Sequence, residues 1–290
     1  MDINYELYKV FYHVANTLSF SAASKQLFIS QSAVSQSIKA LENKLGQTLF
    51  IRSTKKVQLT PEGEILLRHI EPAINLINRG ETQIREASSF GGQIRIGASD
   101  TICRYFLIPY LEKFHKSNPS IHIKVTNATS IGCVELLETG QVDIIVTNFP
   151  NTYLRNISAV KKIRSFRDVF IASCEFDELK GKELSFRELL EYPLLMLNKQ
   201  STTSEFLHDQ FLKHQLDLVP EIELSSNDLL MDLARIGLGI AFIPDYCFTQ
   251  PSDDLFIVQT EEPLPSRELV LAYNEHIPTT KAIEEFLNYF

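Results

Sequence analysis

The chain has 290 residues, of which 44% are hydrophobic and 22% are charged, and its net charge is −8. This composition is ordinary for globular proteins and excludes extensive disorder, while the length predicts two domains or more. The sequence has no apolar run near the roughly 20 residues that span a bilayer, and its start lacks the basic and apolar regions of a signal peptide. We therefore expect a cytoplasmic protein with no membrane segment.

The four cysteines form no CxxC pair, and the seven histidines show no metal-ligand spacing. This pattern indicates reduced thiols and predicts no metal or other cofactor. The charge is unevenly spread, because residues 1–60 contain seven Lys and Arg against three Asp and Glu, whereas the remainder contains 21 against 33. A basic head on an acidic body favours nucleic-acid contact through the head alone.

The first sixty residues predict a helix-turn-helix. Apolar residues at helical spacing indicate a helix over residues 5–16, and Ser19 or Ser21 can cap a short second helix. A third helix is expected from Gln31 to Leu45, ending at a glycine and keeping one polar face outside. Short polar side chains on such a face suit the edges of bases in a major groove. The candidate DNA-contacting residues are Ser30, Gln31, Ser32, Ser35, Gln36 and Lys39.

A β-hairpin wing is predicted next. The alternating runs Thr48–Arg52 and Val57–Leu59 are joined by a polar, basic turn. We expect Arg52, Lys55 and Lys56 at the tip of this wing, where they would reach the DNA backbone or the minor groove.

A linker helix is expected over residues 61–90, with Pro72 kinking it or removing one hydrogen bond. Its near-heptad apolar stripe consists of Leu66, Ile70, Ala73, Ile74, Ile77 and Ile84. An apolar stripe outside a domain core needs a partner. The same helix of a second subunit is the simplest one, and packing on its own domain is the alternative.

The remainder, residues 91–290, alternates predicted strands and helices. This alternation predicts an α/β domain with largely parallel sheets. The expected strands are Gln93–Ala98, Ile121–Ala128, Val142–Thr147, Asp168–Ser173, Leu194–Leu197, Glu221–Leu224, Gly239–Ile243 and Leu269–Ala272.

The whole chain resembles the LysR-type transcription regulators. In the head the resemblance rests on Ala22, Ala23, Leu27, Ser30 to Ser35, Ile38, Leu41, Glu42, Leu45, Gly46, Leu49, Phe50, Arg52, Leu59, Thr60 and Gly63. In the body it rests on Ile94 to Ala98, Phe106 to Pro109, Leu137, Gly140, Asp143 and Gly237 to Pro244. Many family members carry Arg where Gln36 stands, which affects the operator preference.

The resemblance implies a winged helix-turn-helix DNA-binding domain over 1–60, a dimerisation helix over 61–90 and an effector domain over 91–290. The effector domain would be periplasmic-binding-protein-like, with two Rossmann-like lobes, lobe I at about 91–162 and 265–290 and lobe II at about 163–264. The implied partners are double-stranded DNA, a small-molecule co-inducer and further copies of the chain, as a homodimer or homotetramer.

In such sheets a ligand binds at the carboxyl ends of strands, where helix N-termini point. The candidate effector-binding residues there are Ser99, Asp100, Thr101, Thr129, Ser130, Thr147, Ser201, Thr202 and Thr203. Clustered hydroxyls favour a small anion such as a carboxylate, although each Ser or Thr can equally be a plain helix cap. Asp100 would repel an anion, or would meet the amine of an amphoteric ligand.

Three other functions compete with an effector-responsive regulator. Cys103 and Cys133 fall in first helical turns, where a lowered thiol pKa would make a redox sensor, although inert buried cysteines are far commoner. An enzyme is disfavoured because GxSxG, P-loop, GxGxxG and HExxH motifs are missing. A solute-binding protein without a transcriptional role is disfavoured by the helix-turn-helix. We expect no enzymatic activity.

Overall fold

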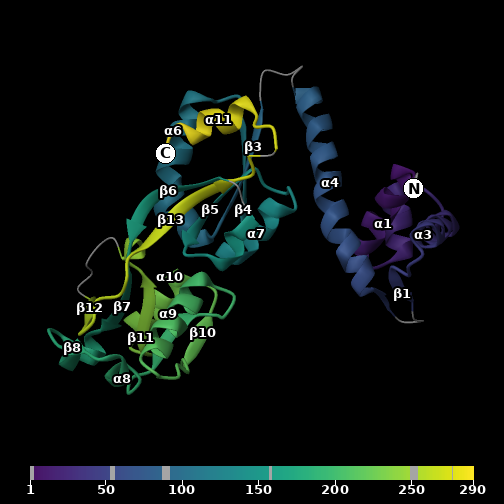
Figure 1. Ribbon diagram of the computed structural model, residues 1–290. Coiled ribbons are helices and arrows are strands. Elements are labelled where there is room, and N and C mark those ends of the chain that lie inside the picture. Colours follow the sequence, from purple (N-terminus) through teal and green to yellow (C-terminus); the bar gives the residue numbers. More distant parts are fainter. Residues whose placement is uncertain (1–2, 53–55, 87–91, 157–158, 249–253, 276) are drawn as a thin grey trace. The chain divides into compact units, whose positions relative to one another are not determined.

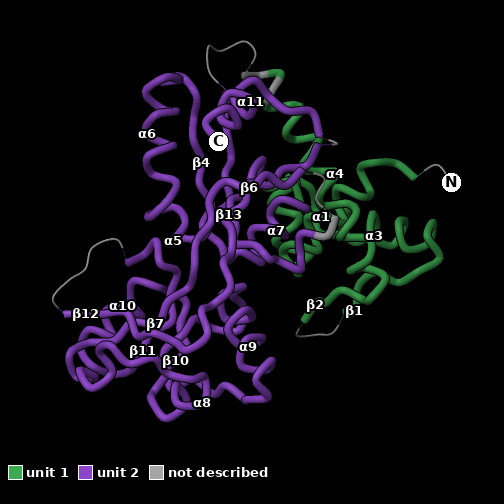
Figure 2. The backbone as a smooth tube through the Cα atoms, turned by 60° about the vertical axis from the view of Figure 1, so that its left-hand side comes forward, with its two compact units in different colours: residues 1–88, 139–141 green, residues 89–138, 142–290 purple. Residues whose placement is uncertain are grey.

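The computed structural model describes residues 3–52, 56–86, 92–156, 159–248, 254–275 and 277–290. It divides into two compact units, one of residues 1–88 with 139–141 and one of residues 89–138 with 142–290 (Figure 2). The first unit is helical with one small hairpin, and the second contains two sheets. Within the described residues, no helix is both long and apolar enough to cross a membrane.

Three helices form the head of the first unit: α1 (Tyr5–Thr17), α2 (Phe20–Leu27) and α3 (Gln31–Leu45). Each begins after an N-cap residue whose side chain accepts a hydrogen bond from a backbone N–H of the first turn, and these residues are Asn4, Ser19 and Ser30. Their apolar faces meet in one buried cluster that includes Phe11, Val14, Val34, Ile38 and Leu41. The predicted helix-turn-helix is confirmed.

The wing is the antiparallel pair β1 (Phe50–Arg52) and β2 (Val57–Leu59), and it leads directly into α4 (Pro61–Glu86). Thr60 ties this junction together: its hydroxyl donates to Thr48 O (2.7 Å) and accepts from Gly63 N (3.0 Å). A Cβ on Gly63 would lie 2.3 Å from Leu49 O, so only glycine fits where the first turn of α4 passes the backbone of Leu49.

Helix α4 is continuous through Pro72, and its apolar stripe is divided between two environments. Leu66 and Ile70 pack against the core of the head. Ile77 and Ile84 are 42% and 75% exposed. Leu66 and Ile70 therefore pack on their own domain, whereas Ile77 and Ile84 present an apolar surface near the C-terminal end of the helix.

Lobe I of the second unit is built on a five-stranded sheet with strand order β4-β3-β5-β13-β6. Its strands are β3 (Gln93–Ala98), β4 (His122–Asn127), β5 (Ile144–Phe149), β6 (Ala159–Phe166) and β13 (Arg267–Tyr273). Its helices are α5 (Asp100–Ile102), a π-helix (Cys103–Leu107), α6 (Ile108–Ser117), α7 (Ser130–Glu138) and α11 (Lys281–Leu287), and a 3-10 turn covers Thr152–Asn156 (Figure 1).

Lobe II is built on a six-stranded sheet with strand order β10-β9-β11-β7-β12-β8. Its strands are β7 (Asp168–Ser173), β8 (Glu183–Leu184), β9 (Leu194–Leu197), β10 (Ile222–Leu224), β11 (Ile240–Pro244) and β12 (Leu255–Thr260). Its helices are α8 (Phe186–Leu189), α9 (Thr202–Lys213) and α10 (Asn227–Arg235), with 3-10 turns at Cys174–Leu179 and Asp245–Cys247.

Both sheets are mixed, so the expectation of largely parallel sheets is corrected. β13 runs antiparallel to β5 and β6, and β7 runs antiparallel to β11 and β12. The antiparallel strands are the ones that carry the chain between the lobes: β6 continues into β7 through Arg167, and β12 leads to β13. The crossover after Phe166 lies later than the expected lobe boundary near residue 162.

One hydrophobic cluster runs through both lobes, joining residues such as Ile96 and Leu269 of lobe I to Leu195 and Leu230 of lobe II. Separate clusters cover the other face of each sheet, around Val134 in lobe I and Phe211 in lobe II. The carboxyl ends of β3, β5 and β9 and the starts of α7, α9 and α10 are left to polar residues.

Candidate functional sites

The outer face of α3 carries the predicted DNA-contacting residues as one stripe. Gln31, Ser32, Gln36 and Lys39 are exposed, and Ser35 is half-buried. Spacing of one, four, five and eight residues from Gln31 places them on one side of the helix. Ser30 is the N-cap, since its Oγ accepts from Ala33 N (3.2 Å) and lies 2.9 Å from Ser32 Oγ.

Arg52 is the last residue of β1, and its side chain is held against α3. Its Nη1 donates to Ser35 Oγ and its Nη2 donates to Glu42 Oε2, both at 3.3 Å. The ring of Phe20 lies 4.6 Å from its guanidinium carbon. Glu42, which was not predicted as a site residue, also accepts from Leu49 N (2.9 Å). The ion pair of Arg52 and Glu42 therefore braces the wing against α3, which carries Glu42.

The wing itself is only partly described. Lys56 is exposed beside β2. Lys55 lies outside the described residues. A shallow groove between α3 and the wing is lined by Phe20, Gln31, Ser32, Ser35, Arg52 and Val57.

A cavity of about 90 Å³ lies in the second unit, with residues of both lobes in its wall. Seven of the nine predicted effector-binding residues line it: Ser99, Asp100, Thr101, Thr129, Ser130, Ser201 and Thr203. The other two are near but turned elsewhere. Thr147 is fully buried and its hydroxyl donates to Ser130 O (3.4 Å). Thr202 accepts from Arg267 Nη2 (3.3 Å).

Four helices begin at the cavity wall, and the hydroxyl group that caps each one uses its oxygen as an acceptor. Ser99, Thr129, Ser201 and Ser226 accept backbone N–H groups of α5, α7, α9 and α10 at 3.1–3.3 Å. Within the described residues, none of these hydroxyls is a donor. A hydroxyl that accepts through its oxygen keeps one proton to donate. These protons and the helix N-termini make the cavity suited to an anion.

The wall also contains Asn148, which belongs with Thr147 to a polar segment that the sequence places at the end of a strand. The wall residues that the sequence did not single out are Leu197, Asn198, Ser225, Ser226, Asn227 and Tyr246. Ser226 could have been found, because it is a serine directly before a helix. Tyr246 had no local signal, because it comes from a 3-10 turn that only the fold brings to the cavity. Burial raises its pKa well above the ordinary value, so its phenol stays protonated.

The two lobes are joined by polar contacts around the cavity. On one side Asn227 Nδ2 donates to Thr101 Oγ1 (2.9 Å), and Tyr105 OH donates to Asp228 Oδ1 (2.5 Å). On the other side Asn148 of lobe I contacts the Thr203 hydroxyl at 3.5 Å. Lobe I and lobe II are thus bonded to each other at both ends of the cavity.

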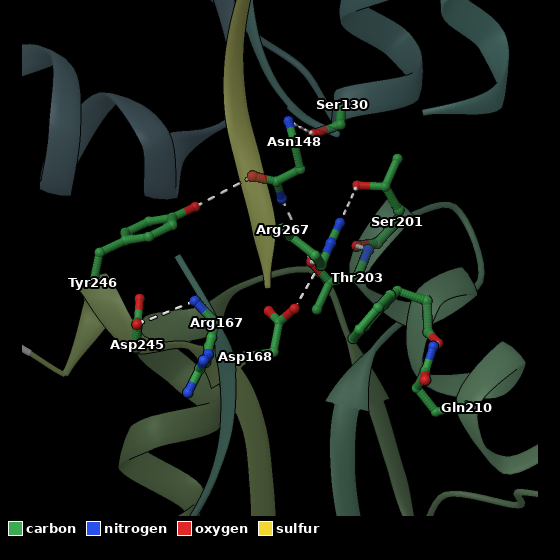
Figure 3. Close-up of polar contacts among 12 residues, drawn as sticks. Ser130, Asn148, Arg167, Asp168, Ser201, Thr203, Gln210, Asp245, Tyr246 and Arg267 are labelled. Carbon is green, nitrogen blue, oxygen red and sulfur yellow. Dashed lines mark hydrogen bonds and ion pairs between the residues drawn. The ribbon is translucent and has the colours of Figure 1, made fainter. Parts of the chain in front are cut away.

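A buried ion pair lies beside this wall (Figure 3). Arg267, at the start of β13, donates from Nη1 to Asp168 Oδ2 (2.8 Å), at the start of β7, and to Thr203 Oγ1 (3.1 Å). Both charged side chains are at most 1% exposed. Burial raises the pKa of Asp168 and the Arg267 guanidinium opposes this rise. Neither residue was predicted, because an isolated Arg and Asp 99 positions apart give no sequence signal.

The two cysteines near the cavity are protonated thiols at neutral pH. Burial raises the pKa of Cys103 to about 11 and that of Cys133 to about 12. Cys133 is fully buried and its Sγ donates to Ala128 O (3.5 Å). A helix N-terminus can lower the pKa of a thiol, but desolvation by burial is the largest influence on these two. Of the described residues, no three His, Cys, Asp or Glu side chains are grouped as a metal site would require.

Comparison with known proteins covers both units. The model of the bacterial regulatory helix-turn-helix protein, lysR family, matches residues 5–64, and that of the LysR substrate binding domain matches residues 87–290. The probable RuBisCO transcriptional regulator of Thalassiosira pseudonana is 25% identical over 97% of this chain and 94% of its own. The regulator AlsR of Bacillus subtilis is 27% identical over 93% of this chain and 91% of its own.

Solved structures share the fold of the whole chain. CbnR, a LysR family transcriptional regulator, aligns over 99% of this chain and 98% of its own, with a TM-score of 0.65 and 19% identity. Full-length CbnR complexed with its target DNA gives a TM-score of 0.68 at 18% identity, over 99% of this chain and 98% of its own. The regulatory domain of Synechocystis CcmR in complex with 2-PG gives 0.62 at 20% identity, over 68% of this chain and 95% of its own. With both family models matched along almost the entire sequence, the chain belongs to the LysR family of DNA-binding transcription regulators, which are not enzymes.

Proposed function

We propose that this regulator binds operator DNA through α3 and the wing and responds to a small carboxylate held in the cavity of its second unit. The DNA-contacting residues in this proposal are Ser30, Gln31, Ser32, Ser35, Gln36, Lys39, Arg52, Lys55 and Lys56. The protein acts in the cytoplasm, where operator DNA is found. The exposed polar stripe of α3 supports this assignment, because base edges need accessible donors and acceptors.

The proposed carboxylate site rests on one observation: the hydroxyl groups that cap the helices at the cavity wall still have protons to donate. A carboxylate oxygen accepts several hydrogen bonds and prefers the positive end of a helix. Thr129 of lobe I and Ser201 of lobe II offer both from opposite walls of the cavity. A ligand that bridges them gains contacts only when the lobes are close, so it favours one arrangement of the lobes.

We also propose that the protein works as a homodimer or homotetramer. The exposed apolar residues Ile77 and Ile84 of α4 support this, because an apolar surface on a long helix is stabilised by pairing. Two-fold pairing would place two heads on the two halves of a pseudo-palindromic operator.

The alternative of a thiol-based sensor has less support. The raised pKa values of Cys103 and Cys133 leave little thiolate at neutral pH, and the thiolate is the form that oxidants attack.

The test uses two helix-capping threonines of lobe I. Thr129→Val removes a cap whose hydroxyl faces the cavity, and Thr280→Val removes the cap of α11, which does not line it. Each loss costs about 1 kcal/mol of stability. Acetate, L-lactate, pyruvate, L-alanine and succinate are titrated against the full-length protein bound to DNA from upstream of its own gene, with gel mobility as the readout.

We expect Thr129→Val to need at least about fivefold more of the active compound, since one buried hydrogen bond of about 1 kcal/mol is lost. Thr280→Val should respond like the wild type. Equal responses of all three proteins would place the effector site outside the cavity and refute this half of the proposal.

A further inference from the structure

The cavity wall has few charged side chains for a site that binds an anion. Of its described lining residues, Asp100 is the only one with a charged side chain, and no Lys, Arg or His is among them. Arg267 reaches the wall indirectly through Thr203, but its charge is already paired with Asp168 at 2.8 Å. The site therefore offers hydrogen-bond donors to a negative ligand without any free cation.

This inventory sets an upper limit on the negative charge of the ligand. Each helix N-terminus contributes roughly half an elementary charge, and hydroxyl donors such as that of Thr129 add only partial charges. One carboxylate can be satisfied in this way. A dicarboxylate or a phosphate ester usually needs Arg or Lys, and here it would also face the carboxylate of Asp100.

The same wall contains one buried hydrogen-bond acceptor without a donor. Asn227 is 5% exposed and lines the cavity, and its Oδ1 is buried with no hydrogen-bond partner among the described residues. Its Nδ2 is bonded to Thr101 Oγ1 (2.9 Å), which joins α10 to α5. Asp100 and Thr101 both belong to α5, and both line the cavity together with Asn227. Buried acceptors left without donors are costly, so a ligand that brings donors is favoured.

We infer that the effector is a small zwitterion of the α-amino acid class, an inference that rests on the proposed function. Its carboxylate accepts from the capping hydroxyls of Thr129 and Ser201, and its ammonium group donates to Asp100 and to the Asn227 side. The three ammonium protons match the two carboxylate oxygens of Asp100, an exposed residue, and the buried amide oxygen of Asn227. The cavity volume of about 90 Å³ restricts the side chain to a few heavy atoms.

The experiment compares matched ligands on the full-length protein by isothermal titration calorimetry. The panel pairs L-alanine with L-lactate and L-serine with L-glycerate, which differ only in ammonium against hydroxyl, and adds malonate and phosphoglycolate as more highly charged anions. The variants are Asp100→Asn, which keeps the side-chain shape, and Asp217→Asn, an exposed aspartate that does not line the cavity. Thr129→Val reports whether a ligand occupies the cavity.

We expect Asp100→Asn to change the affinities for amino acids and for hydroxy acids in opposite directions. Asp100→Asn should weaken binding of the better amino acid by about tenfold and strengthen binding of its hydroxy acid by a few fold, because one carboxylate attracts an ammonium and repels an anion. Asp217→Asn should change neither. Tighter binding of malonate or phosphoglycolate than of either amino acid, with sensitivity to Thr129→Val, overturns the inference and leaves the proposed function intact. Failure of both amino acids to bind also overturns it, whereas binding of any panel member that ignores Thr129→Val counts against the proposed function itself.

Discussion

The outer face of α3 and the cavity of the second unit use the same kinds of side chain in opposite ways. On α3 the polar residues are exposed, and Gln31 and Gln36 can adjust to a partner. In the cavity the hydroxyls of Thr129 and Ser201 are fixed by helix N-termini before any ligand arrives. A face that reads a polymer needs reach and adaptability, whereas a site for a small molecule needs preset geometry, because few contacts must supply all the affinity.

The largest expected effect lies in the buried polar region of the second unit. Arg267→Met would leave the Asp168 carboxylate buried without its partner, so the second unit should lose about 3–5 kcal/mol of unfolding free energy. The double change Asp168→Leu with Arg267→Met should recover most of this loss, because it leaves no unpaired charge. Urea unfolding measures both. If the single variant were as stable as the wild type, the pair would have no structural role.

The buried thiols should react more slowly than a thiol on the surface, which is a second test of the difference between interior and surface. Burial raises the pKa of Cys103 to about 11 from an ordinary 9.0, which reduces its thiolate fraction at pH 8 about a hundredfold. In a Cys174→Ala background, which removes the exposed thiol, alkylation by iodoacetamide should be slow at pH 8 and keep rising beyond pH 9. A rate that levels off below pH 8 would instead indicate a reactive sensor thiol.

On the DNA-reading face, substitutions should change recognition without changing stability. Gln31→Ala with Ser35→Ala should weaken operator binding by about 1–3 kcal/mol while unfolding changes by less than about 0.5 kcal/mol. Gln47→Ala, exposed just after the helix, is the matched control. Gel shifts on operator and on random DNA measure the ratio of affinities. An unchanged ratio in the double variant would remove these residues from base reading.

The smallest effect is expected from the wing. Lys56→Ala should weaken binding to operator and random DNA alike and make the salt dependence shallower by about one counterion, because a phosphate contact carries no sequence information. Fluorescence anisotropy between 50 and 200 mM salt, about the range over which such slopes are read, measures it. A loss restricted to the operator would show that Lys56 reads bases.

Much of the fold follows from local patterns in the sequence. The caps Ser19 and Ser30 and the four-three-four spacing of the α3 core residues are short-range signals, so the head was predicted closely. In the body, β6 was missed because it is largely exposed, with Lys161, Lys162 and Arg164 along it, and has no apolar run. The antiparallel pairing of β13 depends on partners far away in the chain.

The cavity shows the same division. Its hydroxyls were found because a strand followed by Ser or Thr and a helix is a local pattern. Much of its remaining wall was not, since residues such as Tyr246 reach it only through the tertiary fold. Thr202 was predicted to line the cavity, but its hydroxyl accepts from Arg267 instead. The contacts of Arg52 were missed for a related reason: the sequence indicated a basic wing, but the ion pair with Glu42 and the contact with the Phe20 ring come from packing.

The two chain crossings between the lobes have a mechanical consequence. Phe166 pairs with Arg267 where β6 and β13 lie side by side, so both crossings leave lobe I next to the buried pair of Arg267 and Asp168. Any change in the angle between the lobes must turn about this point, which acts as a fulcrum. Thr203 links the fulcrum directly to the cavity wall. A ligand at this wall acts close to the fulcrum. A small displacement of the wall therefore produces a larger displacement at the far edges of the lobes.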